Sequence, residues 1–382
     1  MSAYKSNSPL TARLGKPYMY TESFGDSWSS AWLDDGRVLT LSCDTKGWRE
    51  GCGADGSNWA LNELTGDFTN AGGLYGRTVN PMKSHPFDFG RWANVKYDED
   101  GVKRMWKANS IAFADGSLYV SVSRHGPMIS GTDYLQDSIN ASIIRSDDFG
   151  ETWSMTEDRC YFDPMFPGRR FPLPCFVQYY RGGGPVPAEG GLFASPHESG
   201  VYVYAVSNDG YWNNGNVIYL ARIRRDRMHD MNADDWQYFY GSTGDNNDGC
   251  WSPDPALKTP ILQNPRRLSM AGVQYIWPLR RYVMLQAYYP EPYSKTFDTS
   301  ATCFEFYEAP APWGPWSSFY RCDFNGPGYY TPEILLKSIT PDGNGGCKMF
   351  LLTAGDWKTC GNAVTIYRMT AIELNLRPGA VS

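Results

Sequence analysis

Apolar and polar residues alternate in five short runs that are spread along the whole chain. The runs cover residues 37–42, 117–123, 201–207, 282–289 and 347–355. Alternation with a period of two predicts strands that have one buried face. An apolar stretch and a turn precede each run, with the turns near residues 36, 116, 200, 281 and 343. The pattern therefore predicts five β-hairpins.

Further alternating runs follow most of these hairpins, as at 216–223 and 236–241 and again at 301–309 and 316–324. Each hairpin thus grows into a unit of about four strands, and a regular series of such units is typical of a β-propeller. Five units account for all 382 residues. We therefore expect an all-β, five-bladed β-propeller of four-stranded antiparallel blades, as a single domain over residues 1–382. Residues 16–21 are expected to supply an N-terminal strand that closes the last blade.

One local motif supports this fold independently. The segment from Ser146 to Trp153 matches the Asp-box pattern S-x-D-x-G-x-T-W. In that pattern a carboxylate caps a tight hairpin and the tryptophan packs between strands. The motif is found in sialidases and in other propellers, so it supports the fold and does not identify a reaction.

The composition excludes several classes of protein. Hydrophobic residues make up 42% of the chain and aromatic residues 15%, with 39 Gly and 26 Pro, which rules out disorder and long helical bundles. The net charge is −6 and basic runs are missing, so nucleic acid is not an expected partner. No stretch of about 18 apolar residues occurs, so no membrane partner is expected either. We expect a monomer.

Nine cysteines indicate an oxidising compartment. By proximity they pair as Cys43 with Cys52, Cys160 with Cys175, Cys303 with Cys322 and Cys347 with Cys360, which leaves Cys250 over. The alternative is a set of unrelated buried thiols. We expect disulfides and a secreted, extracellular protein whose leader is absent from this chain, which begins without an apolar signal core.

Propeller geometry gathers candidate site residues at one mouth. Function is expected on the face where inner strands begin and second strands end. Counting ten residues back from each turn reaches Asp26, Trp106, Gly190 and Glu333. The second strands end in polar or aromatic groups, namely Asp44, Arg124, His125, Asn208, Asp209, Tyr288, Tyr289 and Asp356. Carboxylates, cations and flat aromatic rings at one opening are typical of a carbohydrate site.

Three carboxylates are the catalytic candidates. Glycoside hydrolysis needs one protonated and one ionised carboxyl group, and crowding drives their pKa values apart. Asp26 and Asp44 are expected on neighbouring strands of the first blade, and Glu333 on the adjacent last blade. His125, which ends a second strand, is the fourth candidate. For each of them the alternative is a turn-forming or structural role.

Other polar and aromatic groups near the predicted mouth are candidates for binding substrate. Lys107 and Asn109 lie on an inner strand, where a lysine needs a partner to offset its desolvation. The full set of expected substrate contacts is Trp28, His85, Lys107, Asn109, Arg124, Glu189, Asp209, Trp212, Tyr330 and Asp356. We expect no cofactor and no catalytic metal. The run Gly244–Asp248 is a candidate for a structural calcium and is also ordinary turn sequence.

Several phrases of the sequence resemble a known family. The segment Gly25–Gly36, the strand that ends at Asp44 before Gly47 and Trp48, the phrase Tyr219–Ile223 and the phrase Tyr307–Trp316 all carry the resemblance. The family is a five-bladed propeller family of formerly unknown function that includes endo-D-arabinanases. The resemblance implies a secreted glycoside hydrolase that uses Asp26 and Asp44. This chain has Cys43-Asp44-Thr45 where the family has Gly-Asp-Gly.

We therefore expect an enzyme that hydrolyses glycosidic bonds of a plant or microbial polysaccharide. One alternative is a polysaccharide lyase, more distantly similar, that would act at a uronate such as rhamnose-glucuronate. A lyase would use His85, His125 or Tyr330 as the base, and Lys107 or Arg124 to neutralise the uronate. A second alternative is a lectin-like propeller that binds glycans without catalysis.

Overall fold

The structure is a computed structural model, and it describes residues 9–82, 96–128, 136–184, 200–243, 248–270, 272–290, 301–325, 328–355 and 366–379. In these ranges strands are the dominant regular structure, which confirms the all-β class. Its two α-helices are short, α1 (Glu157–Phe162) and α2 (Arg225–Met228), and 3-10 turns lie at Arg181–Gly183, Ala233–Asp235 and Pro255–Leu257. In this part of the chain no helix has the length and apolar character needed to span a membrane.

Two sheets are formed by the first part of the chain. The first sheet contains β2 (Ser23–Asp26), β3 (Ser30–Trp32), β4 (Val38–Trp48), β5 (Ser57–Gly66) and β6 (Leu74–Asn80). The second contains β7 (Lys96–Tyr97), β8 (Lys103–Ala114), β9 (Ser117–Met128) and β10 (Gln136–Ser146). The strands within each sheet pair in antiparallel fashion through short turns.

The rest of the chain forms one large sheet and a final four-stranded sheet. The large sheet has ten strands: β11 (Cys175–Gln178), β12 (Tyr202–Asn208), β13 (Gly215–Arg224), β14 (Trp236–Thr243), β15 (Asp248–Ser252), β16 (Leu262–Leu268), β17 (Gly272–Ile276), β18 (Arg281–Tyr288), β19 (Ala301–Ala309) and β20 (Ser317–Asn325). The final sheet contains β21 (Tyr330–Pro341), β22 (Cys347–Ala354), β23 (Thr370–Pro378) and β1 (Leu10–Met19).

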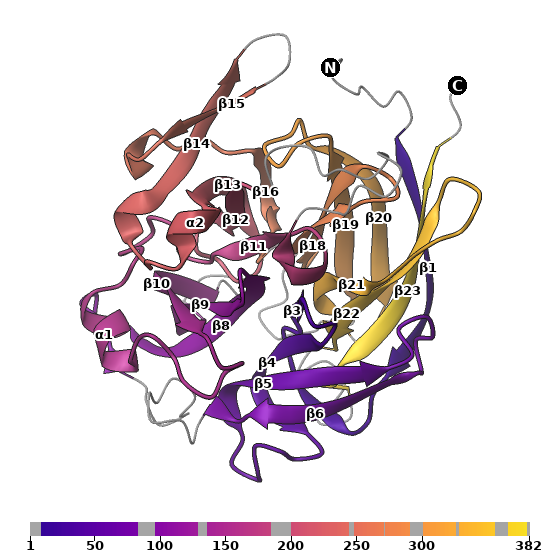
Figure 1. Cartoon of the computed structure of the whole chain (residues 1–382), viewed down its shortest axis with the longest axis horizontal. Helices are drawn as coiled ribbons and strands as arrows, with labels where there is room; N and C mark the ends of the chain where they lie inside the picture. The colour runs from indigo at the N-terminus through magenta and orange to yellow at the C-terminus, as the bar shows by residue number, and fades with distance from the viewer. Residues whose placement is uncertain are drawn as a thin grey trace.

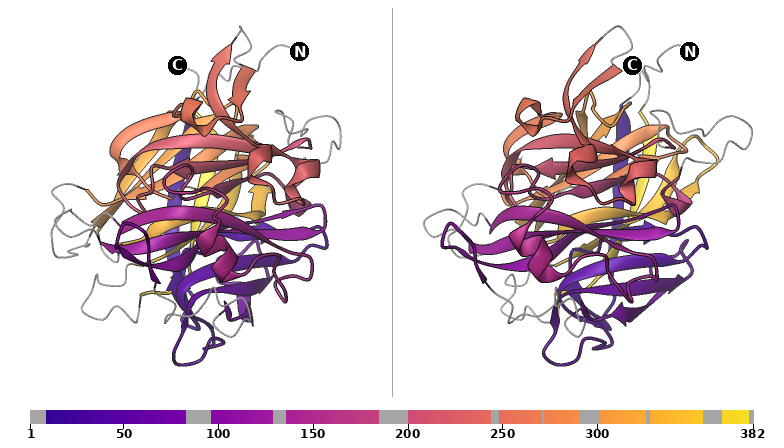
Figure 2. Two further views of the ribbon diagram at one scale, coloured as in Figure 1. Left: turned by 90° about the vertical axis from the view of Figure 1, so that its left-hand side faces the viewer. Right: turned by 60° about the vertical axis from the view of Figure 1, so that its left-hand side comes forward.

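The sheets surround a common centre. Strand β3 contacts β8, β8 contacts β11, β11 pairs with β17, β17 contacts β21, and β21 contacts β3. Of these strands, β3, β8, β11 and β21 are labelled in Figure 1 and lie toward its middle, and the later strands of each group lie farther out. The side views in Figure 2 show the successive sheets one above another. The inner strands therefore form a closed ring, hereafter the inner ring, made of β3, β8, β11, β17 and β21.

The two ends of the described chain meet in the final sheet. The sequence predicts a closing strand over residues 16–21, and the structure has it as β1, which begins earlier, at Leu10, and ends at Met19. Strand β1 pairs antiparallel with β23, from Leu10 opposite Pro378 to Met19 opposite Thr370. Figure 1 shows the indigo β1 and the yellow β23 side by side. Because β1 comes from the start of the chain, this pairing fastens the first residues of the fold to the last.

The described sheets differ from the prediction in two ways. There are four of them rather than five separate blades, because β11 pairs with β17 in parallel, with Val177 opposite Val273, and so joins two groups of strands. In addition, the first inner strand is divided into β2 and β3. Gly25 has φ 134° and Ser27 has φ 54°, values that interrupt a regular strand.

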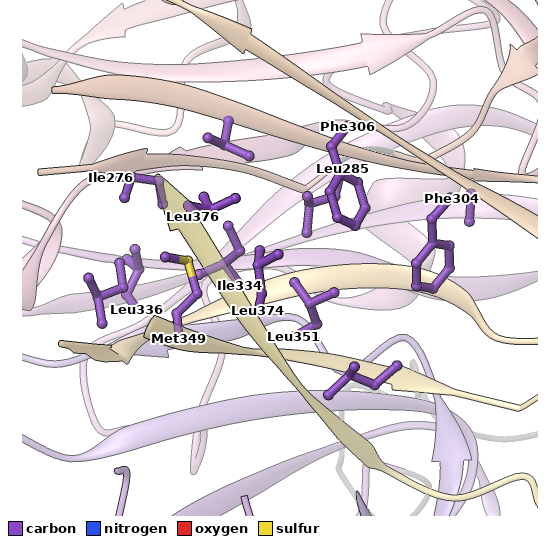
Figure 3. Packing of buried hydrophobic residues seen from close by; sticks show 14 of the residues in the cluster. Ile276, Leu285, Phe304, Phe306, Ile334, Leu336, Met349, Leu351, Leu374 and Leu376 are labelled. Atoms are coloured by element: carbon purple, nitrogen blue, oxygen red, sulfur yellow. The ribbon is translucent and has the colours of Figure 1, made fainter. Parts of the chain in front are cut away.

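The hydrophobic core lies between facing sheets. In Figure 3, Leu285 and Phe306 of the large sheet lie opposite Ile334, Leu351 and Leu374 of the final sheet. These side chains are almost completely buried. Burial of large aliphatic and aromatic side chains stabilises a fold by about 1.5–3 kcal/mol each. The packed faces hold the inner ring in position.

The cysteines do not form the predicted disulfides. Cys43, Cys52, Cys160, Cys175, Cys250, Cys303, Cys322 and Cys347 are all thiols, and Cys360 lies outside the described residues. Register explains one case. Cys322 is opposite Phe304, the neighbour of Cys303, so the two sulfur atoms point to opposite faces of the sheet. The Cys43 thiol instead donates to the carbonyl of Ala108 at 3.3 Å.

The Asp-box motif has the predicted turn structure. The backbone amide of Gly150 donates to Ser146 Oγ at 2.7 Å, and that of Thr152 donates to Asp148 Oδ1 at 2.8 Å. The Trp153 ring packs edge-on against Trp59 with centroids 5.8 Å apart. The motif therefore has a structural role in this chain.

Candidate active site

Asp26 ends β2 and lies in an almost closed environment, 6% exposed. Its Oδ2 accepts hydrogen bonds from the hydroxyls of Tyr330 and Tyr367, the latter at 2.7 Å. Its Oδ1 is buried without a hydrogen-bond partner among the described residues. Burial raises the pKa of Asp26 to about 6, the charge of Asp44 acts in the same direction, and Lys107 and the two tyrosines oppose it.

Asp44 and Lys107 form an ion pair next to Asp26. Lys107, on β8, is 3% exposed, and its Nζ donates to Asp44 Oδ1. Asp44 lies on β4 with a φ of 42°, and its side chain is 46% exposed. Burial disfavours the charged form of Lys107, but the Asp44 carboxylate outweighs it and raises the lysine pKa. The pair therefore puts one fixed positive and one fixed negative charge beside Asp26.

Glu333 lies on β21 and is 8% exposed. Its Oε1 accepts a hydrogen bond from the backbone amide of Ser30 at 2.8 Å, which connects β21 to β3. Burial raises the pKa of Glu333 to about 7, although hydrogen bonds from Ser30 and Ser29 partly oppose the shift. This carboxyl group consequently keeps its proton to higher pH than Asp26.

A small cavity lies beside Glu333 at the centre of the inner ring. It is lined by Ser27, Ser29, Asn109, Cys175, Met270, Gly272, Thr331, Pro332 and Glu333. These residues come from β8, β11, β17 and β21 and from the segments just before β3 and β17. Its volume is about 10 Å³, enough for the centre of about one water molecule.

Three polar atoms of this cavity are buried without a hydrogen-bond partner among the described residues: Ser27 Oγ, Asn109 Nδ2 and Thr331 Oγ1. Asn109 uses only its other amide atom, Oδ1, which accepts from Ser123 at 3.0 Å. A buried polar group without a partner costs about 1–3 kcal/mol. The arrangement can therefore bind one water molecule or a single hydroxyl group.

His125 is not exposed at an opening. It lies on β9, its Nδ1 is 3.0 Å from Ser138 Oγ, and its ring packs on Trp212 with centroids 4.6 Å apart. Burial lowers the pKa of His125 to about 3, and Lys107 and Arg104 act in the same direction. The imidazole is therefore neutral at ordinary pH, and its role in catalysis stays a prediction.

Arg124 is completely buried within an ion-pair network. Its Nε donates to Asp98 Oδ1 at 3.1 Å, and its Nη2 donates to the carbonyl of Arg104 at 2.6 Å. Arg104 in turn contacts Asp98 and Asp137. These contacts hold Arg124 within the second sheet, and its role in binding substrate stays a prediction.

The predicted aromatic contacts lie inside the cores. Trp28 is 1% exposed, and its Nε1 donates to the carbonyl of Gly25 at 3.1 Å. Trp212 is likewise buried. A ring can stack on a sugar only if one of its faces is accessible, so neither tryptophan is such a platform in this conformation. Tyr330 is brought to the site instead through its hydroxyl group, on Asp26.

The remaining candidates are separate from the acids or outside the described residues. Asp209 accepts from the side-chain amide of Asn216 at 2.7 Å, and its own carbonyl accepts from Arg169 at 2.8 Å, which is a turn-stabilising role. His85, Glu189 and Asp356 lie outside the described residues, as does most of the run Gly244–Asp248. In the described ranges, no group of three or more His, Cys, Asp or Glu side chains is arranged to hold a metal ion.

Sequence reasoning missed Tyr367, which donates directly to Asp26. The residue precedes β23 and is 2% exposed. Its only signal in the sequence is its place just before the last apolar run, since no motif surrounds it. The backbone amide of Ser30, which binds Glu333, was also missed because backbone donors carry no sequence signal at all.

Comparisons with known proteins give only distant similarities. No family model and no curated protein matches the chain. Among solved structures, a putative hydrolase from Bacteroides ovatus is 12% identical, with a TM-score of 0.48 over 98% of this chain and 96% of that one. A xylan β-1,4-xylosidase from Bacillus halodurans is 11% identical, with a TM-score of 0.46 over 94% of this chain and 56% of its own.

A GH43_1 enzyme from Xanthomonas citri, complexed with xylose, is 10% identical, with a TM-score of 0.44 over 94% of this chain and 89% of that one. This chain spans about half the length of the xylosidase that it resembles. Its function must therefore be argued from its own residues.

Proposed function

We propose that this chain is a five-bladed β-propeller glycoside hydrolase that cleaves a polysaccharide with Asp26 and Glu333. The observation that supports it best is a pair of buried carboxyl groups from opposite ends of the sequence, both near the segment that connects β2 to β3. The inner ring of five contacting strands supports the propeller. Two of its blades share one sheet through the parallel pair β11 and β17.

Glu333 is the proton donor in this proposal. Its pKa of about 7 keeps it protonated in weakly acidic and neutral solution, so it transfers a proton to the glycosidic oxygen as the bond breaks. Asp26, with a pKa of about 6, supplies the ionised carboxylate that acts at the anomeric carbon, either directly or through water. Both groups have the required form between about pH 6 and about pH 7.

Asp44 and Lys107 set the charge around Asp26. The Asp44 carboxylate favours the protonated form of Asp26, while Lys107 favours the ionised form. Among the described residues, Asn109 Nδ2 and Thr331 Oγ1 have no hydrogen-bond partner beside Glu333, and one hydroxyl group of a sugar would bind there. These groups orient the sugar so that its glycosidic oxygen faces Glu333.

A polysaccharide panel tests this proposal. The wild-type protein is incubated with plant and bacterial polysaccharides, and both new reducing ends and ultraviolet absorbance are measured. We expect reducing ends without the absorbance of an unsaturated uronate, which a lyase would generate. Asp26→Asn is expected to lower the rate by at least about 100-fold. Its unfolding temperature should not fall below that of the wild type, because asparagine carries no buried charge.

The matched control is Asp35→Asn. Asp35 is half-exposed in the first hairpin turn, where it binds Arg37 at 2.6 Å. This variant loses the same charge and should keep full activity. Retained turnover in Asp26→Asn, or ultraviolet absorbance in place of new reducing ends, would contradict the proposal.

A further inference from the structure

A second hollow lies next to Asp26 and Asp44 on the first sheet. Its volume is about 270 Å³. Charged side chains and one aromatic ring line it, namely Glu22, Phe24, Lys46, Arg49, Glu50 and Arg368. Three cations and two carboxylates thus surround a space many times larger than the cavity beside Glu333. The hollow therefore has room for a chemical group that Glu333 and its neighbours do not hold.

The three cations of this hollow differ in whether a hydrogen bond or a carboxylate offsets their charge. Arg49 Nε donates to Glu22 Oε2 at 2.8 Å, so these two charges offset each other. Arg368 donates to the carbonyl of Ser23; burial lowers the pKa of Arg368, and the charge of Glu50 opposes that shift. Lys46 has no hydrogen-bond or ion-pair partner among the described residues, and its Nζ lies 5.5 Å from the centre of the Phe24 ring. One positive charge is therefore left over at the wall of the hollow.

The hollow is adjacent to the catalytic candidates through two connections. Lys46 follows Asp44 by two positions on β4, and the pairing of β4 with β5 keeps its register through Cys43 and Thr45. Asp44 and Lys46 are partly exposed while Cys43, Thr45 and Gly47 are buried, so the two side chains lie on the same, more open side of β4, although the positive φ of Asp44 and a register shift against β2 make the strand irregular there.

The second connection runs through aromatic rings. The Phe24 ring packs edge-on against Tyr367 with centroids 5.5 Å apart, and the Tyr367 hydroxyl binds Asp26. One layer of rings therefore separates the hollow from the Asp26 carboxyl group. The side chain of Asp44 is 46% exposed, so a chain of sugar units bound at Asp44 would extend past Lys46 into this space.

We propose that the hollow is a subsite for an anionic sugar unit, whose carboxylate or sulfate group is received by Lys46 and Arg368. The inference rests on the proposed function, which places a polysaccharide at Asp26, and it specifies the substrate class as an acidic polysaccharide. A charge-assisted contact from an ammonium or guanidinium group to an oxyanion is stronger than a neutral hydrogen bond. A neutral sugar would leave the charge of Lys46 without a partner.

Binding of three small probes to the intact wild-type protein tests this inference. The probes are D-glucuronate, D-glucose 6-sulfate and D-glucose, and binding is followed by titration calorimetry at low salt. At least one anionic probe should bind about 10-fold more tightly than glucose, and its affinity should fall as salt is raised. The two anionic probes differ in their acidic group. The one that binds more tightly therefore shows whether the subsite prefers a uronate or a sulfate ester.

Variants of Lys46 connect that preference to the hollow. Lys46→Gln should reduce the preference for the anionic probe about 10-fold, and Lys46→Arg, which keeps the charge, should retain most of it. The control is Lys16→Gln, which removes an exposed lysine of β1 that lines a different groove. Glucuronate and glucose 6-sulfate that bind no better than glucose, or a preference that survives in Lys46→Gln, would overturn the inference.

The outcomes for the inference and for the proposed function are distinguishable. If the wild type cleaves a neutral polysaccharide and Lys46→Gln has no effect on any probe, hydrolysis stands and the acidic subsite is wrong. If no polysaccharide is cleaved while probe binding depends on Lys46, the subsite stands and hydrolysis is wrong. Unfolding curves of Lys46→Gln and Lys46→Arg that overlay the wild-type curve exclude a folding defect.

Discussion

Two carboxyl groups of this protein are unusually weak acids because they are buried. Glu333 and Asp26 are each less than one-tenth exposed, and in both cases loss of water is the largest cause of the raised pKa. Among the described residues, no cation forms an ion pair with either group, because Lys107 donates to Asp44 instead. A fold that keeps two acids partly protonated at neutral pH loses stability in return, and this loss can be measured.

Glu333→Gln should make the protein more stable at alkaline pH. The folded state holds the Glu333 proton up to about pH 7, whereas the unfolded state releases it near pH 4.5. The folded state therefore binds more protons in this window, and stability falls as pH rises through it. The loss is complete above about pH 7 and amounts to about 3 kcal/mol at most. Glutamine carries no charge and can still accept the hydrogen bond from Ser30.

Urea unfolding of both proteins at pH 4 and at pH 8 measures this effect. At pH 4 Glu333 is protonated in both states, so wild type and variant should have similar midpoints. At pH 8 the variant should unfold at a higher urea concentration. An equal difference at both pH values would show that the ionisation of Glu333 is not the cause.

The residues around Asp26 illustrate what the sequence can and cannot predict. Asp26, Asp44 and Lys107 were predicted together because they end or occupy neighbouring strands, and hairpin spacing is visible in the sequence. Tyr367 was not predicted, because it is 341 positions away from Asp26 and reaches it only when the chain closes. Trp28 and Trp212 were assigned to a sugar site by residue type, but type does not reveal which face of a strand is covered.

At the scale of the elements, a glycine of β6 leaves room for an aromatic ring that packs on the first sheet. Gly76 on β6 lies directly under the ring of Trp48, and a Cβ atom there would be 2.3 Å from the indole. Trp48 also packs against Trp28 and Tyr20, with centroids 6.3 and 5.5 Å apart. The position of Trp48 thus determines how β4, which carries Asp44, lies on the sheet.

Gly76→Ala is expected to destabilise the protein by about 1–3 kcal/mol, because the Trp48 ring must move to make room. Thermal unfolding followed by tryptophan fluorescence measures the change. Gly184→Ala is the control, since its nearest atom outside the adjacent residues is 4.0 Å from the new Cβ and its φ of −84° suits alanine. Equal unfolding temperatures for Gly76→Ala and the control would contradict the packing explanation.

The alternation of apolar and polar residues was sufficient to predict most of the strands. It could not predict the register in which the strands pair. Runs such as 117–123 and 201–207 became β9 and β12 because a period of two fixes which side chains are buried. The division between β2 and β3 depends on Gly25 and Ser27, whose backbone angles no hydrophobic pattern encodes. The pairing of Cys303 with Cys322 failed for the same reason, since proximity in sequence does not determine the face of a sheet.

For the whole molecule, closure of the chain is the feature that brings Glu333 to the segment that follows Asp26, where it binds the amide of Ser30. Strand β21 contacts both β17 and β3, and β1 completes the sheet that contains β21. The sequence predicts this closure because an N-terminal strand is left over once five hairpins are counted. It does not predict the parallel pair of β11 with β17, because Val177 and Val273 are far apart in sequence and no turn connects them.

Leu10 tests how much stability depends on this closure. Its side chain is 3% exposed in the core between the large and the final sheet, and its backbone amide donates to Glu308 Oε1 at 2.6 Å. Glu308 also accepts from Arg281 at 3.1 Å, so β1 is connected to both β18 and β19. Leu10→Ala keeps the backbone contact and removes only the packed side chain.

We expect Leu10→Ala to lower the free energy of unfolding by about 2–5 kcal/mol, the usual cost of a cavity at a buried leucine. Thr11→Ala, at the next and exposed position, should change it by less than about 0.5 kcal/mol. Urea unfolding of both variants measures the difference. If β1 were only a loose edge of the final sheet, Leu10→Ala would unfold at the same urea concentration as Thr11→Ala. A large difference would mean that the first strand of the chain helps to hold together the two sheets on either side of it, and with them the ring on which Glu333 is placed.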